Sequence, residues 1–523
     1  MGATDPKQEY PVTHGMIHSS PVLGCTARTL AALLLTLGLA CGGGGSKPAD
    51  PPTPPGAFVV QTGTTAAALT LKPFAANQQD KVGPADWEPQ YGKLPEIVIS
   101  PTSAGLDLAL QSYDDPAKAR ALVLRFANDG SDAFTLTKAY QAPSLGLLLG
   151  FASAPDGGFY YATGSGDAQV SATYPPVGMY RSNIVRVYRA DAAGQVQFDV
   201  DLDLARHQFK NDAEPLIHPG VASSARLAVA GGQLALVHGI NTGYDANANA
   251  RHQKAISTYL DAQTGAITAA SGIWCSHSFD QRLLVDGSDL YELHLGDAYP
   301  RQVVVSRVRS GKAGSGFGLC ALKGALGANN TFTRLGGMAR IDSGSGAGGY
   351  LTLFAMEHGD VVAKTVNTSR DLALVRTVPD FASGPAAQAL DGTFGSIFTV
   401  TSSGATVTNR VLWLTNYDST GNTQHAERPK LVALGGGQFL VLWERWTLGT
   451  ATTFDGTYAM RIDGAGSVLA AATRVSDSHL PRGDDAFLYR GAACFVTGDG
   501  ATGRLVLHRI SAALVGSEVT LLP

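Results

Sequence analysis

Short apolar runs separated by turn residues dominate the chain beyond residue 95. The runs are mostly four to eight residues long, rich in Val, Leu, Phe and Tyr, and interrupted by Gly, Asp and Asn. Runs of this kind are typical of β-strands, and amphipathic helical periods are nearly absent. The pattern therefore predicts an all-β fold.

One longer pattern recurs: a histidine, a few polar residues that often include Arg, a strand, a Gly-rich turn and a second strand. Four segments carry it: HPGVASSARLAVAGGQLALVHG (218–239), HSFDQRLLVDGSDLYELHLGD (277–297), HAERPKLVALGGGQFLVLWER (425–445) and HLPRGDDAFLYRGAACFVTGDG (479–500). Several units also contain a hairpin turn with Asp and Gly, at 191–194, 261–265 and 463–466. A glycine there supplies the positive φ that a tight hairpin requires.

The repeats have the spacing of β-propeller blades. His218 and His277 are 59 residues apart, and His425 and His479 are 54 residues apart. Repeats of about 40–50 residues with four strands are typical of such blades. Weaker units cover 95–141, 142–217, 325–383 and 384–424. We therefore expect a seven- or eight-bladed β-propeller over residues 95–523.

The N-terminal segment has the features of an export signal. Leu30–Ala40 is an apolar run of eleven residues that follows Arg28 and precedes Cys41. A run of this length is too short to span a bilayer, which needs about 20 residues, and it fits the core of a signal peptide. We assign residues 1–40 to the signal peptide, with Met16 as an alternative start, 41–56 to a flexible Gly/Pro-rich linker, and 57–94 to an irregular segment.

Ala40 and Cys41 make this segment resemble a bacterial lipoprotein signal, in which the cysteine is lipidated and becomes the mature N-terminus. The family prefers Leu and a small residue where this chain has Gly38 and Leu39. Ordinary cleavage followed by secretion is the alternative. The resemblance implies a protein of the bacterial cell envelope, held at the membrane only by its lipid, on the periplasmic side or at the surface.

The repeats also resemble those of bacterial extracytoplasmic β-propeller lipoproteins. The family pattern LVxWE…RIDxxGxVL is matched by FLVLWERWTLGTATTFDGTYAMRIDGAGSVLAA (439–471). This resemblance covers most of residues 95–523. It implies the propeller fold, whereas proteins with this motif have many different functions.

The composition of the chain narrows the range of molecules that it is expected to bind. Only 16% of residues are charged, and 39 Lys and Arg stand against 43 Asp and Glu, so the formal net charge is −4. A chain without a basic excess is not expected to bind nucleic acid. Outside the cytoplasm disulfides persist, and we expect Cys275 to pair with Cys320 because both lie in one repeat unit. No CxxC motif points to a structural zinc site or a redox pair.

Antiparallel strands bring the candidate residues to one face of the propeller. The start of each innermost strand and the end of the strand after it lie on the same face, and ligand sites of propellers usually form there, over the channel. Histidines occupy both kinds of position: His218, His277, His425 and His479 precede innermost strands, and His238, His294 and His358 end second strands.

Three sets of residues on this face are candidates for chemistry. His277, His294, Tyr299 and Arg301 contain the groups for general base, general acid and carboxylate clamp in a β-elimination on a uronic acid. Ligand binding is assigned to Arg282, Asp297, Glu444 and Arg445. His238, His294 and His358 would hold a divalent metal ion if their imidazoles converge. The structural alternative is that each histidine caps its own blade.

These candidate residues lead to three functional hypotheses. The leading hypothesis is a binding or protein-interaction module, whose partner is another envelope protein or a glycan. The second is an enzyme acting on anionic polysaccharide, and the third is a metal-binding envelope protein with a divalent metal as its cofactor. They differ in whether the candidate side chains converge on one pocket.

Overall fold

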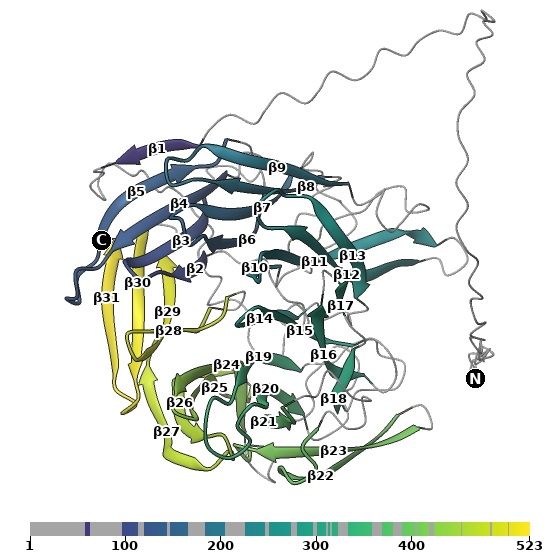
Figure 1. Cartoon of the computed structure of the whole chain (residues 1–523). Helices are drawn as coiled ribbons and strands as arrows, with labels where there is room; N and C mark the ends of the chain where they lie inside the picture. The colour runs from purple at the N-terminus through teal and green to yellow at the C-terminus, as the bar shows by residue number, and fades with distance from the viewer. Residues whose placement is uncertain are drawn as a thin grey trace, which may run out of the picture. The chain divides into compact units, whose positions relative to one another are not determined.

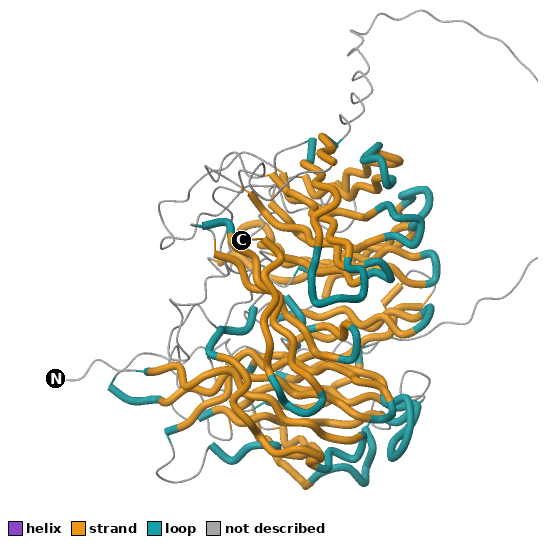
Figure 2. Tube along the Cα trace, turned by 90° about the vertical axis from the view of Figure 1, so that its left-hand side faces the viewer, coloured by secondary structure: helices purple, strands orange, loops and turns teal. Residues whose placement is uncertain are grey.

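The structure of the chain is a computed structural model that describes most of the residues. It covers 58–62, 97–112, 120–143, 147–165, 184–203, 225–245, 250–273, 280–296, 301–309, 312–313, 316–322, 333–357, 369–379, 390–402, 405–417, 423–450, 452–481, 484–499 and 502–522. All regular elements in this part are strands, as Figure 2 shows. None of the described residues forms a helix that is long and apolar enough to cross a membrane.

The described strands form seven antiparallel sheets around a ring, which confirms the all-β propeller and gives it seven blades (Figure 1). We number the blades along the chain. From the innermost strand outward, the first three are β2 (Ile97–Pro101), β3 (Gly105–Ser112), β4 (Arg120–Ala127), β5 (Thr135–Gln141) and β1 (Val59–Thr62) in blade 1; β6 (Leu147–Ser153), β7 (Phe159–Ser165), β8 (Ile184–Ala190) and β9 (Val196–Asp203) in blade 2; and β10 (Arg226–Ala230), β11 (Gln233–Asp245), β12 (Ala250–Asp261) and β13 (Ile267–Ile273) in blade 3.

The other four blades are built in the same way, two of them with an extra strand; in blade 4 the last two strands both pair with the third. They are β14 (Gln281–Asp286), β15 (Asp289–Leu295), β16 (Gln302–Arg309), β17 (Lys312–Ala313) and β18 (Phe317–Ala321) in blade 4; β19 (Arg334–Arg340), β20 (Tyr350–Glu357), β21 (Arg370–Thr377), β23 (Ala405–Trp413) and β22 (Ser396–Ser402) in blade 5; β24 (Gln424–Gly435), β25 (Gln438–Thr447), β26 (Thr453–Asp463) and β27 (Val468–Ser476) in blade 6; and β28 (Phe487–Tyr489), β29 (Ala492–Asp499), β30 (Arg504–Ser511) and β31 (Gly516–Leu522) in blade 7.

Apolar side chains fill all seven junctions between neighbouring blades. Successive side chains of a strand point to opposite faces of the sheet. In β11, Leu234 and Leu236 therefore pack on blade 2, whereas Ala235 packs on the blade 4 side. A strand covered on both faces has no polar face, which explains why the sequence shows continuous apolar runs.

The ring is closed between blades 7 and 1 by packing. Leu106, Leu108 and Leu124 of blade 1 share a core with Val496 and Leu507 of blade 7. Each described strand lies in the blade of its neighbours in sequence, and none of blade 7 pairs with blade 1. An ion pair between Arg509 and Asp132 adds a polar contact across this junction.

Two sequence units differ from the expected division into blades. Residues 384–424 do not form a blade of their own, because β22 and β23 extend the sheet of blade 5. The segment expected to be irregular, 57–94, contains β1, which pairs with β5 as a fifth strand of blade 1. Phe58 precedes β1 and is buried at the junction of blades 1 and 2, with its ring 5.1 Å from that of Phe159.

The Asp/Gly turns predicted from sequence join the two outer strands of a blade and pack against the preceding blade. Gly194, Gly265 and Gly466 all have positive φ. A Cβ at Gly466 would lie 2.1 Å from Cδ2 of Leu412 in blade 5. A side chain at this position would therefore have to displace the side chain of Leu412.

Gly466→Ala is expected to destabilise the propeller by about 2–3 kcal/mol, because it adds steric overlap to an unfavourable φ. Gly436→Ala is the matched control: its φ is also positive, but a Cβ there would meet nothing within 4 Å. We expect the control to cost about 1 kcal/mol. Urea unfolding of both variants measures the difference, and equal losses would show that the contact with blade 5 is unimportant.

Candidate binding site in the propeller channel

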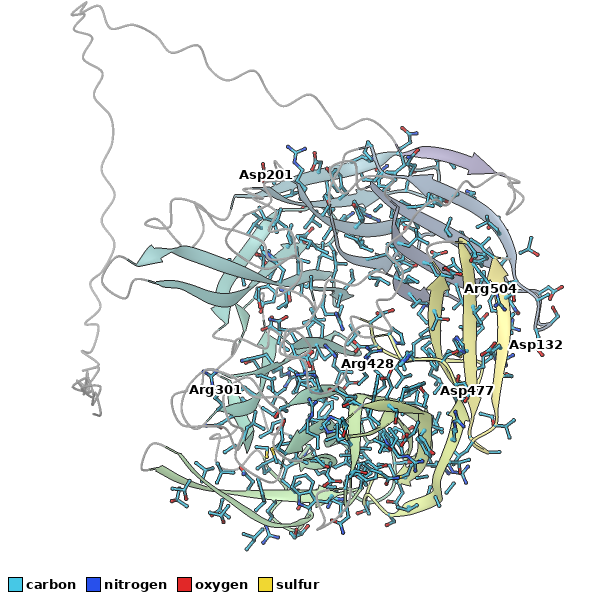
Figure 3. All side chains as sticks on the ribbon, turned by 180° about the vertical axis from the view of Figure 1, so that it is seen from behind. Asp132, Asp201, Arg301, Arg428, Asp477 and Arg504 are labelled. Carbon is cyan, nitrogen blue, oxygen red and sulfur yellow. The ribbon has the colours of Figure 1, made fainter. Side chains whose placement is uncertain are left out.

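A layer of charged side chains crosses the channel where the innermost strands begin. We call these twelve side chains the charged layer. Figure 3 shows one of them, Arg428, near the middle of the ring, whereas Asp477 and Arg504 lie farther out. The members are Arg226, Asp280, Arg282, Arg334, Glu357, Arg370, Glu427, Arg428, Lys430, Glu444, Asp484 and Asp485.

Strand register places four of these residues at equivalent positions. Arg226, Arg282 and Lys430 each precede an apolar residue of an innermost strand, and face Val237, Leu293 and Leu442 on the next strand. Asp485 stands at the same distance before the hairpin of blade 7. The repeat thus directs one charged group from each of blades 3, 4, 6 and 7 toward the axis.

Asp485 connects blade 7 to blades 3 and 4. Its Oδ2 lies 3.3 Å from Nε of Arg226, and its Oδ1 lies 2.8 Å from Nε of Arg282. Burial alone would raise the pKa of Asp485, but the two guanidinium groups hold this pKa well below its usual range. The carboxylate is therefore ionised.

Lys430 connects blade 6 to the same segment, because its Nζ donates to the backbone carbonyl of Asp484. Burial and the neighbouring Arg282 lower the pKa of Lys430, and burial raises the pKa of Asp484.

Asp280 joins blades 4 and 5. Its Oδ1 lies 2.5 Å from Nη1 of Arg282, and its Oδ2 accepts a hydrogen bond from the backbone N–H of Leu335 at 2.8 Å.

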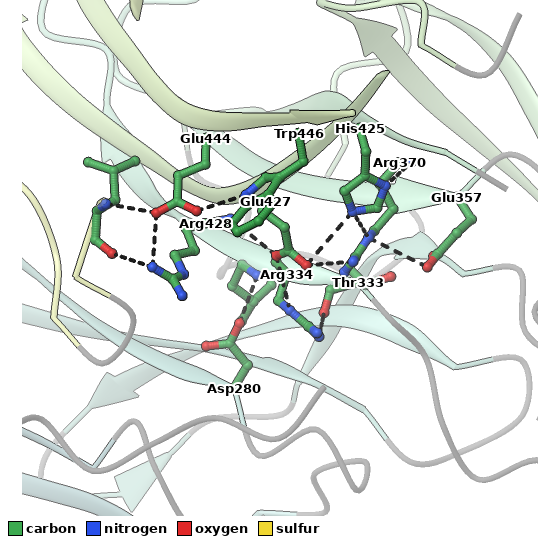
Figure 4. A network of polar contacts seen from close by, with 12 residues as sticks. Asp280, Thr333, Arg334, Glu357, Arg370, His425, Glu427, Arg428, Glu444 and Trp446 are labelled. Atoms are coloured by element: carbon green, nitrogen blue, oxygen red, sulfur yellow. Dashed lines mark hydrogen bonds and ion pairs between the residues drawn. The ribbon is translucent and has the colours of Figure 1, made fainter. Parts of the chain in front are cut away.

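Arg370 is the centre of the part of the layer between blades 5 and 6 (Figure 4). The side chain of Arg370 is fully buried, its Nη2 lies 2.5 Å from Glu427, and its Nε donates to Nε2 of His425 at 3.0 Å. Burial and Arg370 lower the pKa of His425 to about 4, so this imidazole is neutral. Glu357 lies 3.8 Å from Nε of Arg370, and burial raises the pKa of Glu357.

Glu444 joins blades 6 and 7. Its Oε1 accepts from Nη1 of Arg428 at 2.9 Å and from the backbone N–H of Leu480 at 2.8 Å, and its Oε2 accepts from Nε1 of Trp446 at 2.9 Å. His479 lies 3.3 Å from the same carboxylate, and its ring stacks on Phe454. The contacts of His425 and His479 are those expected of structural histidines.

A pocket of about 350 Å³ lies in the channel against the inner strands of blades 4 to 7, between the charged layer and the ends of the innermost strands. We call it the axial pocket. Arg282 and Asp485 line its inner end, Asp286 and Arg340 its outer end, and apolar residues most of the wall between them. Val285 and Leu488 are 45% and 41% exposed. The wall is formed by Leu283, Leu284, Val285, Leu293, Gly336–Ala339, Leu431–Ala433 and Ala486–Leu488.

The pocket opens away from the face predicted for the site. Its lining begins at Arg282 and Asp485, in the charged layer, and ends at Asp286 and Arg340, where the innermost strands end. The sequence predicted binding at the opposite face, where these strands begin. The charged layer occupies that face because the repeat places basic residues at the strand starts, where carboxylates of the neighbouring blades pair with them.

The four proposed catalytic residues are only partly described. His277 and Tyr299 lie outside the described residues. His294 is buried on the face of β15 toward blade 3, and burial lowers its pKa to about 4. Arg301 is also buried. The catalytic assignment stays a prediction.

The proposed binding residues separate into two groups. Arg282 and Glu444 belong to the charged layer. Arg445 points to the other face of β25, where it lies 3.2 Å from Asp455 and stacks on the ring of Tyr458. Neighbouring residues of a strand cannot share one face. Asp297 lies outside the described residues.

The proposed metal ligands His238 and His294 lie in different junctions, toward blades 2 and 3 respectively. His358 lies outside the described residues. In the described part of the chain, no three His, Cys, Asp or Glu side chains are arranged to hold a metal ion. Cys320 is a free, buried thiol, and Cys275, its expected disulfide partner, is not among the described residues.

Sequence reasoning missed most of the charged layer, although a signal was present. An Arg or Lys precedes a leucine in ARLAV (225–229), QRLLV (281–285), TRLGG (333–337) and PKLVA (429–433). Aligning these strands by their hairpins would have predicted a ring of basic residues. The acidic partners follow no repeat, and the sequence gives no comparable signal for them.

Comparisons with known proteins give structural likeness only. No family model and no curated protein matches the chain. The propeller domain of the Trilobed protease from Pyrococcus furiosus matches with 9% identity over 82% of this chain and 99% of its own, at a TM-score of 0.33. A candidate 6-phosphogluconolactonase of Bacteroides fragilis matches with 10% identity over 82% and 94%, at 0.40. An α-L-arabinanase of Penicillium chrysogenum in complex with arabinobiose matches with 10% identity over 57% and 93%, at 0.33.

Proposed function

We propose that this protein is a binding module of the bacterial cell envelope, exported by residues 1–40 and tethered through Cys41, whose axial pocket takes up an apolar group of its ligand. The observation that carries the proposal is the pocket itself. Its volume of about 350 Å³ is at the lower end of the range for small-molecule sites.

The chemistry of the pocket supports binding. Val285 and Leu488 are exposed where it opens, and apolar groups kept accessible inside a concave surface are typical of interaction sites. The charged groups of the lining are engaged with other protein groups, Arg340 with Asp286 and Arg282 with Asp280. An apolar wall fits an apolar ligand or protein side chain better than a glycan.

Val285→Trp places a large side chain at the opening and is expected to weaken binding of 1-octanol by at least tenfold. Isothermal titration calorimetry of the full-length protein measures the affinity, and a negative heat-capacity change on binding would indicate burial of apolar surface. Ile397→Trp is the matched control, because Ile397 is 65% exposed on β22 and does not line the pocket. The proposal is contradicted if the unaltered protein does not bind 1-octanol, or if the two variants bind it equally.

A further inference from the structure

This inference concerns the kind of ligand that the axial pocket selects, and it rests on the proposed function. The polar group that the pocket presents at its inner end is the carboxylate of Asp485. Its side chain is 38% exposed, whereas those of Arg226 and Arg282, which pair with it, are 10% and 7% exposed. A ligand therefore meets the carboxylate before it meets the guanidinium groups.

The charges around this end of the pocket are balanced. Arg226 and Arg282 are compensated by Asp485 and Asp280. Lys430, which donates to the backbone carbonyl of Asp484, and the side chain of Asp484 add one basic and one acidic group to this end. The outer end is balanced in the same way, since Arg340 lies 3.2 Å from Asp286.

A charged ligand would therefore lose its hydration without gaining a counter-charge. Transfer of an uncompensated ion into an apolar pocket is strongly unfavourable. This argues against the anionic ligands that the sequence suggested, at least for this pocket.

The hydrogen bonds of the inner end leave one carboxylate oxygen of Asp485 with room for a further donor. The terminal nitrogens of Arg282 donate to Asp280 and to the carbonyls of Gln281 and Leu335. Oδ1 of Asp485 is buried against Nε of Arg282 at 2.8 Å, so the oxygen of this partly exposed carboxylate that remains for a ligand is Oδ2, which lies 3.3 Å from Nε of Arg226. A carboxylate oxygen accepts more than one hydrogen bond. The pocket is thus set up to receive a donor from its ligand.

We propose that the axial pocket binds an uncharged small molecule with an apolar body and one hydroxyl or amide donor, which it gives to Asp485. At about 30 Å³ for a water-sized group, the volume of about 350 Å³ admits roughly ten non-hydrogen atoms. The apolar body lies against the wall between Leu284 and Leu431, and the donor points toward the charged layer.

Four probes of nearly equal size test the proposal by calorimetry at pH 7: 1-octanol, heptyl methyl ether, octanoate and octylammonium. We expect 1-octanol to bind at least tenfold more tightly than each of the other three. The ether lacks only the donor. Octylammonium keeps a donor and adds a positive charge, whereas octanoate is negatively charged and has no donor. An ether that binds as tightly as the alcohol would overturn the role of the donor, and tighter binding of either ion would overturn the selection for uncharged ligands.

Asp485→Asn provides a second test that uses a ratio of affinities. The variant keeps the size of the side chain and leaves Arg226 and Arg282 with one uncompensated positive charge, so the affinity for octanoate relative to 1-octanol is expected to rise at least tenfold. An unchanged ratio would contradict the proposed charge balance. If none of the four probes binds, or if Val285→Trp binds them as the unaltered protein does, the proposed function itself fails; the other negative results leave it standing.

Discussion

Arg370→Met is expected to destabilise the propeller by about 4–5 kcal/mol at pH 7. Arg370 is fully buried and lies within ion-pair distance of Glu427 and Glu357. Removing one partner of a buried ion pair leaves an uncompensated charge, which costs about 3–5 kcal/mol. The methionine preserves most of the side-chain volume, so little of the loss comes from a cavity. Urea unfolding measures the effect.

The loss should shrink as the pH falls from 7 to 5. Burial alone would raise the pKa of Glu427, but Arg370 and Arg334 hold it well below its ordinary value in the native protein. Glu427 therefore stabilises the fold above the carboxyl pKa of the unfolded chain, and this contribution is lost only at lower pH. Without Arg370 the opposing effect of burial dominates and raises the pKa of Glu427, so protonation toward pH 5 relieves the variant.

Arg340→Met is the matched control for Arg370→Met. The side chain of Arg340 is 54% exposed, and it pairs with Asp286 at 3.2 Å. Exposed ion pairs contribute about 0–1 kcal/mol. Equal losses for the two variants, or a loss for Arg370→Met that does not depend on pH, would contradict the account of the charged layer given above.

Asp485→Ala is expected to destabilise the propeller by about 3 kcal/mol. The substitution leaves Arg226 and Arg282 buried without their shared carboxylate. The expected loss is at the low end of the cost of breaking a buried ion pair, because Asp485 itself is partly exposed. It also removes the ion pairs between blade 7 and blades 3 and 4. The denaturant midpoint should fall without a change in the slope of the transition.

Asp477→Ala tests whether any loss of an aspartate has this effect. Asp477 pairs with Arg474, three residues earlier in the chain, and the two side chains are 83% and 53% exposed. We expect a change of less than about 0.5 kcal/mol. A similar loss in both variants would show that the position of Asp485 at the axis is unimportant.

The fold was predictable because its signals are local and repeated. Each blade contains continuous apolar strands and tight Asp/Gly turns, and the turn glycines Gly194, Gly265 and Gly466 have the positive φ that the sequence predicted. The number of blades was harder to predict. Nothing local shows that β22 and β23 extend the sheet of blade 5, because this depends on pairing of β23 with β21, and the 27 residues 378–404 separate these two strands.

The candidate site was only partly predictable. Antiparallel alternation predicts that His425, His479 and Glu444 approach the same face; in the structure His479 lies 3.3 Å from Glu444, and His425 lies 3.8 Å from Glu427. Charge pairing across the axis joins Arg226 to Asp485, which are 259 residues apart in the chain. No spacing rule relates such residues, because each blade contributes its own member and the ring alone brings them together. The axial pocket is equally a property of the ring.

The closed junction between blades 7 and 1 has a consequence for cooperativity. A linear array of repeats needs terminal caps with a polar outer face, but a ring has no terminal repeat, and every blade here is apolar on both sides. Losing one blade would therefore expose four apolar faces at once: the two of the lost blade and one on each neighbour. We therefore expect the domain to unfold as one cooperative unit, because blade 7 completes the core of blade 1.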